Sequence, residues 1–381
     1  FSLNVAGNWT NNGTFTPSLG TVTLSGIGKT LSGSTTFNNL ATSGSYTGLS
    51  DIVVNVTMNV IGTYTAGGTT TSFSGNFSNT GNFTSSGTAT FTGTGVQMIT
   101  MNSGFNSSGT VNFNGNVAPA FTDVTSPTLA NVSINNTGGI SPVTAWTTGG
   151  TFTIGSGATF VGGSSTHTFN STFNNGGTIS SSGTLLFSPS SSATLTLLGT
   201  AFSSTGTVEF GGLGQITIAG GTPSFNSVNI TNTNLAGVTP ATNWSLSGGI
   251  SIGGGATLNG GTGLSHTVSG DWTNNGTFNC GTSDVTMNNT VNAIIGGTGT
   301  TTFNNLTIAT SAIIGAGASF KVSGNFIDNG TFDATGVIVS FTGSSPSTIS
   351  GTTTAVPFDN LMIAKSSSAT TTLAIDLTEV T

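Results

Sequence analysis

Short segments in which apolar and polar residues alternate recur along the whole chain. Examples are 21–24 (Thr-Val-Thr-Leu), 88–91 (Thr-Ala-Thr-Phe) and 207–210 (Thr-Val-Glu-Phe), each preceded by glycine. A period of two places every second side chain on one face of a β-strand, and the bordering Gly and Asn-Gly steps favour turns. No segment has the 3.6-residue apolar period of a helix. The pattern predicts an all-β protein in which Phe, Trp, Val and Leu point into a narrow core and Thr, Ser and Asn point outward.

These segments belong to a degenerate repeat. The sequence Gly-Asn-Trp-Thr-Asn-Asn-Gly-Thr-Phe at 7–15 returns in related form at 75–83, 171–179, 270–278 and 324–332. A longer duplication relates 141–160 to 239–258. Self-similarity of this kind is typical of proteins built by stacking one small structural unit many times.

The spacing of the copies distinguishes two architectures. A string of β-sandwich modules would repeat at a nearly constant ~100 residues, whereas the glycines that open the copies stand at 7, 75, 270 and 324. A β-solenoid tolerates such uneven spacing, because it can gain or lose a coil without breaking a closed module. We therefore expect one continuous, elongated β-solenoid over residues 1–381, with repeat units that start near residues 5, 73, 167, 268 and 322. At roughly 20 to 25 residues per coil it would have about 15 to 19 coils.

Aromatic residues at equivalent repeat positions are the expected core stripe. They are Trp9, Phe15, Phe37, Trp272, Phe278, Phe303, Phe326 and Phe332. Charged substitution there, for example Phe278→Asp, is expected to disrupt a coil.

Composition removes several classes of function. Only 13 of 381 residues are Asp, Glu, Lys or Arg, and the basic ones are three lysines with no arginine, so no basic patch is available for nucleic acid or an anionic membrane surface. The hydroxyls and amides of Ser, Thr and Asn must solubilise the surface instead. No apolar run reaches the ~20 residues of a membrane-spanning helix, and Cys280 has no partner for an intrachain disulfide.

Few residues offer chemistry. Asp328 and Asp333 flank one Asn-Gly turn, which allows a weak cation site, although solvated turn carboxylates are the simpler interpretation. His167 and His266 are repeat equivalents and are interpreted as turn residues, since a zinc site needs three or four converging ligands. Cys280 occupies a small-residue position. We expect no enzyme activity and no cofactor.

Two lateral surfaces deserve consideration as binding sites. Trp9, Trp146, Trp244 and Trp272 would stack on sugars if exposed, but Phe fills the same positions in sister copies, which favours the core. An ice-binding face would need Thr-x-Thr pairs in every coil. Such pairs occur at Thr21/Thr23, Thr88/Thr90, Thr151/Thr153 and Thr194/Thr196, but their spacing is irregular.

The repeat resembles those of large secreted bacterial surface proteins, the β-strand-repeat proteins, and is similar in style to filamentous-haemagglutinin adhesins and autotransporter passengers. The resemblance implies an extracellular β-solenoid at the cell surface used for adhesion, biofilm matrix or filament building. This chain departs from such adhesins in its near absence of charge. The leading expectation is a structural or adhesive protein that self-associates into fibres; a module that binds surface glycans and an ice-binding solenoid remain alternatives.

The ends of the chain supply the expected contacts between subunits. The first strand-like segment begins inside a repeat unit, and the last resembles the first strand of another unit. Neither segment is flanked by a recognisable polar cap. We expect either a longer repeat array or end-to-end stacking. The expected contact residues are Leu3, Val5, Leu373, Ile375 and Leu377.

Overall fold

The computed structural model describes residues 2–123, 125–198, 202–366 and 368–379. Over these residues every regular element is a β-strand and no helix occurs. The strands pair in parallel and form a β-solenoid of about 18 turns, which confirms the predicted fold class. The chain divides into two compact units, Phe1–Leu185 and Leu186–Thr381.

The strands are short, as expected where glycine and Asn-Gly turns recur every few residues. In the first unit they are β1 (Leu3–Val5), β2 (Trp9–Thr10), β3 (Thr21–Leu24), β4 (Lys29–Ser32), β5 (Thr35–Thr42), β6 (Ser45–Gly48), β7 (Ile52–Val60), β8 (Thr63–Ala66), β9 (Thr70–Phe73), β10 (Asn76–Asn79), β11 (Asn82–Ser85), β12 (Thr88–Phe91), β13 (Met98–Thr100), β14 (Phe105–Phe113), β15 (Ala120–Phe121), β16 (Thr128–Ile134), β17 (Thr147–Thr148), β18 (Phe152–Ile154), β19 (Thr159–Val161), β20 (His167–Phe169), β21 (Phe173–Asn175) and β22 (Thr178–Ser181).

The second unit has the same organisation, and its first strand, β23, begins at the last residue of the first unit. The strand β23 (Leu185–Phe187) is followed by β24 (Ala193–Leu197), β25 (Phe202–Phe210), β26 (Ile216–Gly220), β27 (Ser224–Ile230), β28 (Val238–Pro240), β29 (Ser245–Leu246), β30 (Ile250–Ile252), β31 (Thr257–Asn259), β32 (Ser265–Val268), β33 (Trp272–Asn274), β34 (Thr277–Asn279), β35 (Asp284–Met287), β36 (Ala293–Gly296), β37 (Thr301–Phe303), β38 (Asn305–Ile308), β39 (Ile313–Ala316), β40 (Phe320–Val322), β41 (Phe326–Asp328), β42 (Thr331–Phe341), β43 (Ser347–Gly351), β44 (Ala355–Ile363), β45 (Thr371–Leu373) and β46 (Asp376–Glu379).

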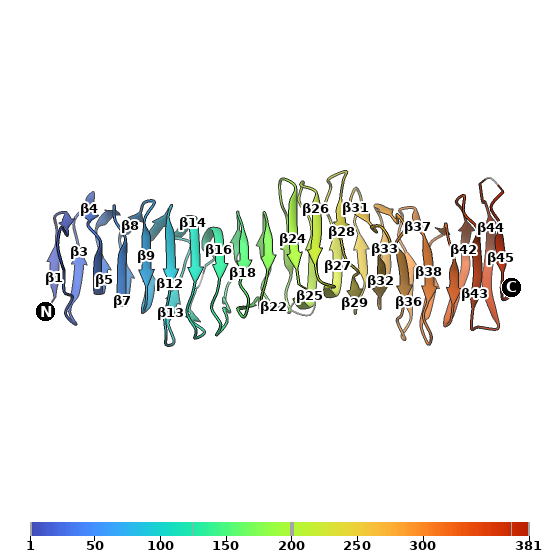
Figure 1. Ribbon diagram of the computed structural model, residues 1–381, viewed down its shortest axis with the longest axis horizontal. Coiled ribbons are helices and arrows are strands. Elements are labelled where there is room, and N and C mark those ends of the chain that lie inside the picture. The colour runs from blue at the N-terminus through green and yellow to red at the C-terminus, as the bar shows by residue number, and fades with distance from the viewer. Residues whose placement is uncertain (1, 124, 199–201, 367, 380–381) are drawn as a thin grey trace. The chain divides into compact units, whose positions relative to one another are not determined.

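Equivalent residues of successive coils pair in register within each unit. In the first unit Leu3 pairs with Val22, Val22 with Leu40, and Leu40 with Met58, so a coil takes 18 or 19 residues there. Figure 1 shows the corresponding strands β1, β3, β5 and β7 side by side. Each ladder is completed by main-chain hydrogen bonds to the coils before and after, which explains how such a thin structure satisfies its backbone polar groups.

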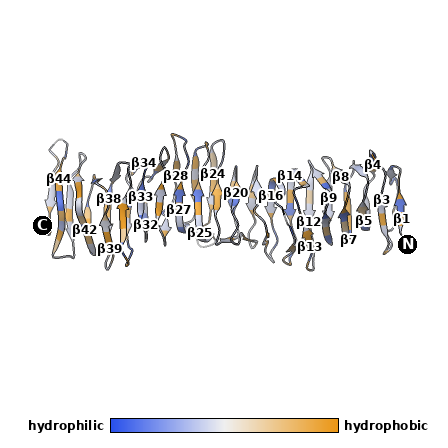
Figure 2. Ribbon diagram, turned by 180° about the vertical axis from the view of Figure 1, so that it is seen from behind, coloured by the Kyte–Doolittle hydropathy of each residue, from blue (hydrophilic) through white to orange (hydrophobic). Residues whose placement is uncertain are grey.

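Alternating side chains build the core. Figure 2 shows hydrophobic and hydrophilic positions alternating along the strands. Inward rings of successive coils stack on each other: the ring centroids of Phe83 and Phe105 are 5.0 Å apart, and those of Phe91 and Phe113 are 5.2 Å apart. Offset aromatic stacks of this kind stabilise beyond their buried area.

Six of the eight expected core aromatics are buried. They are Phe37, Trp272, Phe278, Phe303, Phe326 and Phe332. Trp9 and Phe15 are only half-buried. They belong to the first described coil, and the coil that starts at β3 covers them on one side only.

The prediction that Thr, Ser and Asn point outward is wrong at several buried positions, which include Thr42, Thr71 and Asn232. In the repeat motif Trp-Thr-Asn-Asn-Gly, the first Asn is turned inward: Asn274 is fully buried and Asp328, its equivalent in the last copy, is 1% exposed. The Oδ1 atom of Asn274 accepts the N–H of Gly276 at 3.1 Å, and Oδ1 of Asp328 accepts the N–H of Gly330 at 3.1 Å. The inward side chain therefore closes the turn that follows β33 and β41.

Candidate functional site

The N-terminal end of the first unit has an open strand edge. Among the described residues, β1 pairs with β3 and β2 pairs with β4, each on one side only. Leu3 stands at a core position, since its register partner Val22 is buried, yet Leu3 itself is 37% exposed. Val5 and Trp9 are half-buried. This end therefore presents apolar side chains beside unpaired main-chain groups.

The C-terminal end of the second unit has the same character. Ile363 continues the core column of Val322 and Phe341, and Leu373 continues the column of Phe326 and Ile349.

Ile363 and Leu373 are exposed, although their register partners in the preceding coil are buried. Ile363 is 52% exposed and Leu373 is 53% exposed, whereas Phe341 and Ile349 are completely buried. A hollow of about 360 Å³ at this end is lined by residues 373–377, which include Ile375 and Leu377, both half-buried. The expected contact residues thus lie at the open ends of the two units.

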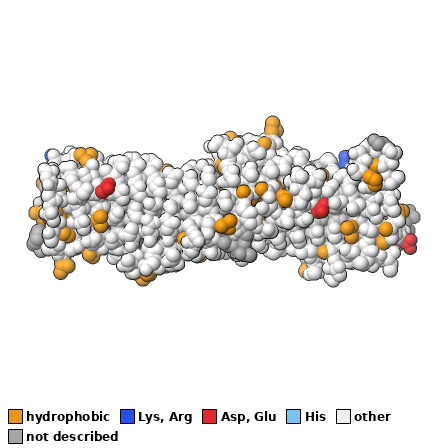
Figure 3. Space-filling view, viewed as in Figure 1, with side chains coloured by type: hydrophobic (Ala, Val, Ile, Leu, Met, Phe, Trp, Pro, Cys, Tyr) orange, Lys and Arg blue, Asp and Glu red, His pale blue; other side chains and the backbone are white. Residues whose placement is uncertain are grey.

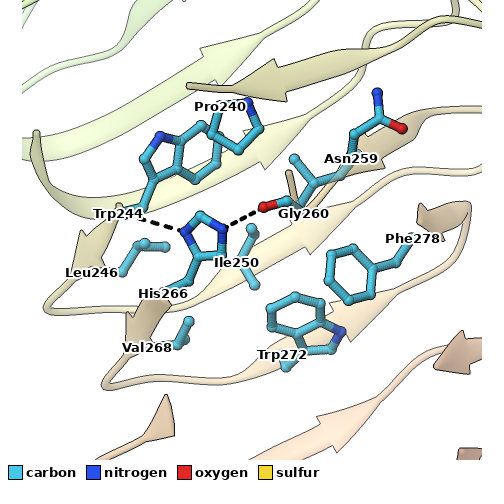
Figure 4. A pocket seen from close by; sticks show the side chains of 11 residues that line it. Pro240, Trp244, Leu246, Ile250, Asn259, Gly260, His266, Val268, Trp272 and Phe278 are labelled. Carbon is cyan, nitrogen blue, oxygen red and sulfur yellow. Dashed lines mark hydrogen bonds between the residues drawn. The ribbon is translucent and has the colours of Figure 1, made fainter. Parts of the chain in front are cut away.

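Two buried histidines form the most specific polar arrangement of the interior. His266 lies in β32 and is 7% exposed, and His167 lies in β20 and is fully buried. The interpretation of both as turn residues is wrong, because each is the inward residue of a strand. Figure 4 shows the imidazole of His266 between Trp244 and Gly260.

Each imidazole uses both ring nitrogens. Nδ1 of His266 accepts the main-chain N–H of Trp244 at 3.2 Å, and Nε2 donates to the carbonyl oxygen of Gly260 at 2.8 Å. For His167 the same bonds run to Trp146 at 3.1 Å and Gly162 at 2.8 Å. The partners define the neutral tautomer with the proton on Nε2.

Burial lowers the pKa of both imidazoles below the ordinary value of 6.5, which outweighs the opposing effect of the bonds to the glycine carbonyls. The charged form is disfavoured because it would be removed from water inside an apolar core. The two histidines are therefore neutral structural groups at pH 7.

The carboxylates proposed for a cation site are Asp328 and Asp333. The structure contains no group of three or more His, Cys, Asp or Glu side chains placed to hold a metal ion among its described residues. Asp328 is buried, which corrects its interpretation as a solvated turn residue, and burial raises its pKa. Asp333 is exposed, and the hydroxyl and N–H of Thr335 that bond to its Oδ1 lower its pKa.

The remaining chemical candidates are mostly enclosed. Trp146, Trp244 and Trp272 are at most 3% exposed, so these three indoles offer no platform for a sugar ring. Cys280 is half-buried, and burial raises the pKa of its thiol, which therefore stays protonated at neutral pH.

The outward threonines form a ladder but not a two-column array. One ladder in the first unit runs through Thr30, Thr47, Thr65, Thr84, Asn106, Thr128, Thr147 and Thr168. The pair Thr88/Thr90 is followed in the next coil by Thr110/Asn112, so amides interrupt the Thr-x-Thr pattern.

Figure 3 shows that the charged side chains on the visible surface are isolated from one another.

A shallow groove interrupts the lateral surface of the second unit. It has a volume of about 440 Å³ and crosses β36, β39 and β42. Gly315 lies at its centre, paired with Ile294 on one side and Asp333 on the other. The nearest atom to a Cβ added at Gly315 would be Oδ1 of Asn292 at 3.8 Å, so packing does not require glycine there. The groove combines an apolar wall with a carboxylate.

These features define a parallel β-solenoid repeat protein with exposed core positions at its first and last described strands. A scan against protein-family models finds no match to the chain, and searches of curated proteins and of solved structures find none either. Over the same residues, no helix has the length and apolar character needed to span a bilayer.

Proposed function

We propose that the chain is an extracellular structural and adhesive repeat protein whose copies join end to end into a filament. The observation that supports this proposal is the exposure of core positions at both ends. Leu3, Ile363 and Leu373 occupy columns whose neighbouring members are buried, and each is 37% to 53% exposed. A second copy placed against an end would cover them as the next coil covers every inner position.

The two ends suit each other chemically. Each presents parallel strands whose outer edge has no partner among the described residues, so main-chain hydrogen bonds can continue the ladders by β-augmentation. Full burial of one Leu or Ile contributes about 1.5 to 3 kcal/mol, so several such side chains offset part of the entropy lost on association. Head-to-tail contacts of this heterologous type do not close on themselves and generate open filaments.

The lateral surface supports an extracellular, matrix-forming role. Ten Asp and Glu residues and three Lys residues are spread over 381 positions, and the outward ladders consist of hydroxyls and amides. Such a surface has no electrostatic patch that would direct lateral association. Growth along the ends is therefore favoured over bundling.

Negative-stain electron microscopy and sedimentation velocity test the proposal. The protein is expected to form filaments, and Leu373→Lys is expected to leave short, unassembled particles, because a charge would be buried at the joint. Thr47→Lys adds the same charge on the exposed lateral ladder and is the matched control, which should still form filaments. Wild-type protein that stays monomeric at high concentration, or a Leu373→Lys variant that polymerises normally, would contradict the proposal.

Glycan binding is a second candidate, favoured by the groove around Gly315. Its carboxylate can bind the hydroxyls of a neutral sugar, and its apolar wall can pack against the sugar's C–H face. The expected partners are glycans on a surface to which the protein adheres. Gly315→Val would fill the groove without a main-chain clash. Binding on a glycan array that survives this substitution would place the sugar elsewhere, and an array without any binding would remove the candidate.

A further inference from the structure

The same buried histidine arrangement occurs once in each unit, at the point where a coil begins a new strand. Trp146 precedes β17 and is the register neighbour of His167 in β20, because Thr147 pairs with Thr168. Trp244 stands in the same relation to His266, because Ser245 pairs with Thr267. The arrangement therefore links one coil to the next.

The imidazole replaces a main-chain acceptor in this ladder. The carbonyl oxygen of Trp244 accepts the N–H of Thr267 at 2.9 Å, which is an ordinary inter-coil bond. The N–H of Trp244 is bound instead by Nδ1 of His266. At the equivalent place the carbonyl oxygen of Trp146 accepts the N–H of Thr168 at 2.9 Å, and Nδ1 of His167 binds the N–H of Trp146. One of the two main-chain hydrogen bonds that each tryptophan residue makes to the next coil thus depends on the protonation state of one ring nitrogen.

We propose that the His167–Trp146 and His266–Trp244 pairs are acid-sensitive locks, one in each unit, which hold neighbouring coils together while the imidazole is neutral and release the Trp segment when it is protonated. A proton from solvent adds to Nδ1, the ring nitrogen that carries no proton in the neutral tautomer. The N–H of the tryptophan then faces an N–H donor, and its hydrogen bond is lost. The new charge lies in an apolar pocket, which adds to the cost.

The surroundings contain little that would stabilise the charged ring. The pocket of His266 is lined by Pro240, Leu246, Ile250, Val268 and other apolar side chains. The charged group that acts on His266 is Asp284 on the neighbouring strand β35, and its attraction opposes the effect of burial. Cys280 lies near Gly260 with a protonated thiol.

His167 lacks even this carboxylate. The Phe160 ring and the imidazole are nearly perpendicular, with centroids 5.1 Å apart, and among the described groups only burial and the bond to Gly162 shift the pKa of His167. The hydrogen bond between His167 and Trp146 is therefore expected to be the more acid-sensitive of the two. The proposal does not depend on filament formation, since both locks lie inside their units.

Amide hydrogen exchange on the whole protein tests the locks directly. Because a neutral buried histidine loses stability as pH falls below the unfolded pKa of about 6.5, protection of the Trp146 and Trp244 amides should fall by up to about 10-fold per pH unit below that value. The amides of Phe152 and Ile250 donate to main-chain carbonyls of Thr172 and Asp271. They are internal controls whose protection should hold if the release is local.

Non-titrating variants complete the experiment. His167→Asn and His266→Asn keep an acceptor oxygen where Nδ1 stands, so protection of the two Trp amides should become independent of pH between 7 and 4.5. ¹⁵N spectra of wild-type histidine provide a readout that needs no variant and should show neutral Nε2–H rings at pH 6. Rings that are protonated with the ordinary pKa, or Trp amides whose protection is unchanged down to pH 4.5, would overturn the proposal.

Discussion

Replacing Asp328 by asparagine should stabilise the protein at neutral pH. Asp328 is 1% exposed, and its carboxylate accepts one main-chain N–H, from Gly330. Burial raises its pKa, so the ionised side chain destabilises the folded protein. At the equivalent position Asn274 makes the same turn bond to Gly276 without a charge, and its amide also donates to the carbonyl oxygen of Thr300 at 3.2 Å.

The size of the gain follows from this comparison. Asp328→Asn keeps the acceptor for Gly330 and removes a buried charge that has a single partner, which corresponds to about 1 to 3 kcal/mol. For a unit of this size, 1 kcal/mol shifts the unfolding temperature by about 2 to 4 °C. Thermal unfolding at pH 8 should therefore show an increase of about 2 to 12 °C.

The pH dependence of the stability gain tests whether the gain comes from removing the buried charge. A carboxyl whose pKa is raised by folding contributes full stability below its unfolded pKa of about 3.9, and this contribution is lost as pH rises through the folded pKa. The advantage of Asp328→Asn should vanish near pH 3.5, where Asp328 is protonated. Asp333→Asn is the matched control: its pKa is lowered, so the variant should be slightly less stable than wild type at pH 8. A variant at position 328 with no gain at pH 8, or with the same gain at pH 3.5, would refute the reasoning.

Other substitutions test the core and the turns. Phe326→Ala should cost about 3 to 5 kcal/mol in urea denaturation, and Phe15→Ala, at the half-buried end, should cost clearly less; equal costs would contradict the difference in burial. Gly297 has φ of +112° and an added Cβ would overlap the carbonyl oxygen of Asn274, whereas Gly336 has φ of +78° with open space around it. Gly297→Ala should therefore destabilise the protein much more than the ~1 kcal/mol expected for Gly336→Ala, and a reversed order of unfolding temperatures would contradict the turn geometry.

The sequence predicts the coil architecture well because alternation and glycine boundaries are local properties. A segment such as β3, with buried Val22 and Leu24 between half-exposed threonines, has its inward face encoded in polarity alone. The repeat then fixes which segments stack. Uneven copy spacing is enough to favour a solenoid, because no closed module would tolerate it.

The polar and apolar pattern does not predict burial where a polar side chain is turned inward and makes a local hydrogen bond. Nothing in the hydropathy of Asn274 or His266 distinguishes them from outward residues; their burial depends on an N–H of the turn or of the next coil. The available clue is positional. The histidines recur 99 residues apart, beside a duplication that places Trp146 and Trp244 98 residues apart. The local pattern does not predict burial at the first coil either: Trp9 has the core motif, but among the described residues its strand is paired on one side only.

The few ionisable groups inside the first unit have opposing effects on its stability. Asp123 is 6% exposed, and burial raises its pKa to about 6, although its Oδ1 accepts the N–H of Met101 at 2.5 Å. The contribution of Asp123 to the free energy of unfolding is lost as pH rises from about 4 through 6. The contribution of neutral His167 is lost as pH falls below about 6.5. Wild-type stability should therefore change little between pH 4.5 and 6.5. Asp123→Asn leaves only the histidine slope and should become less stable in acid, and His167→Asn leaves only the carboxyl slope and should become more stable in acid. Thermal unfolding at three pH values in this range measures both slopes, and slopes of the same sign would show that these two groups do not control the acid response of the unit.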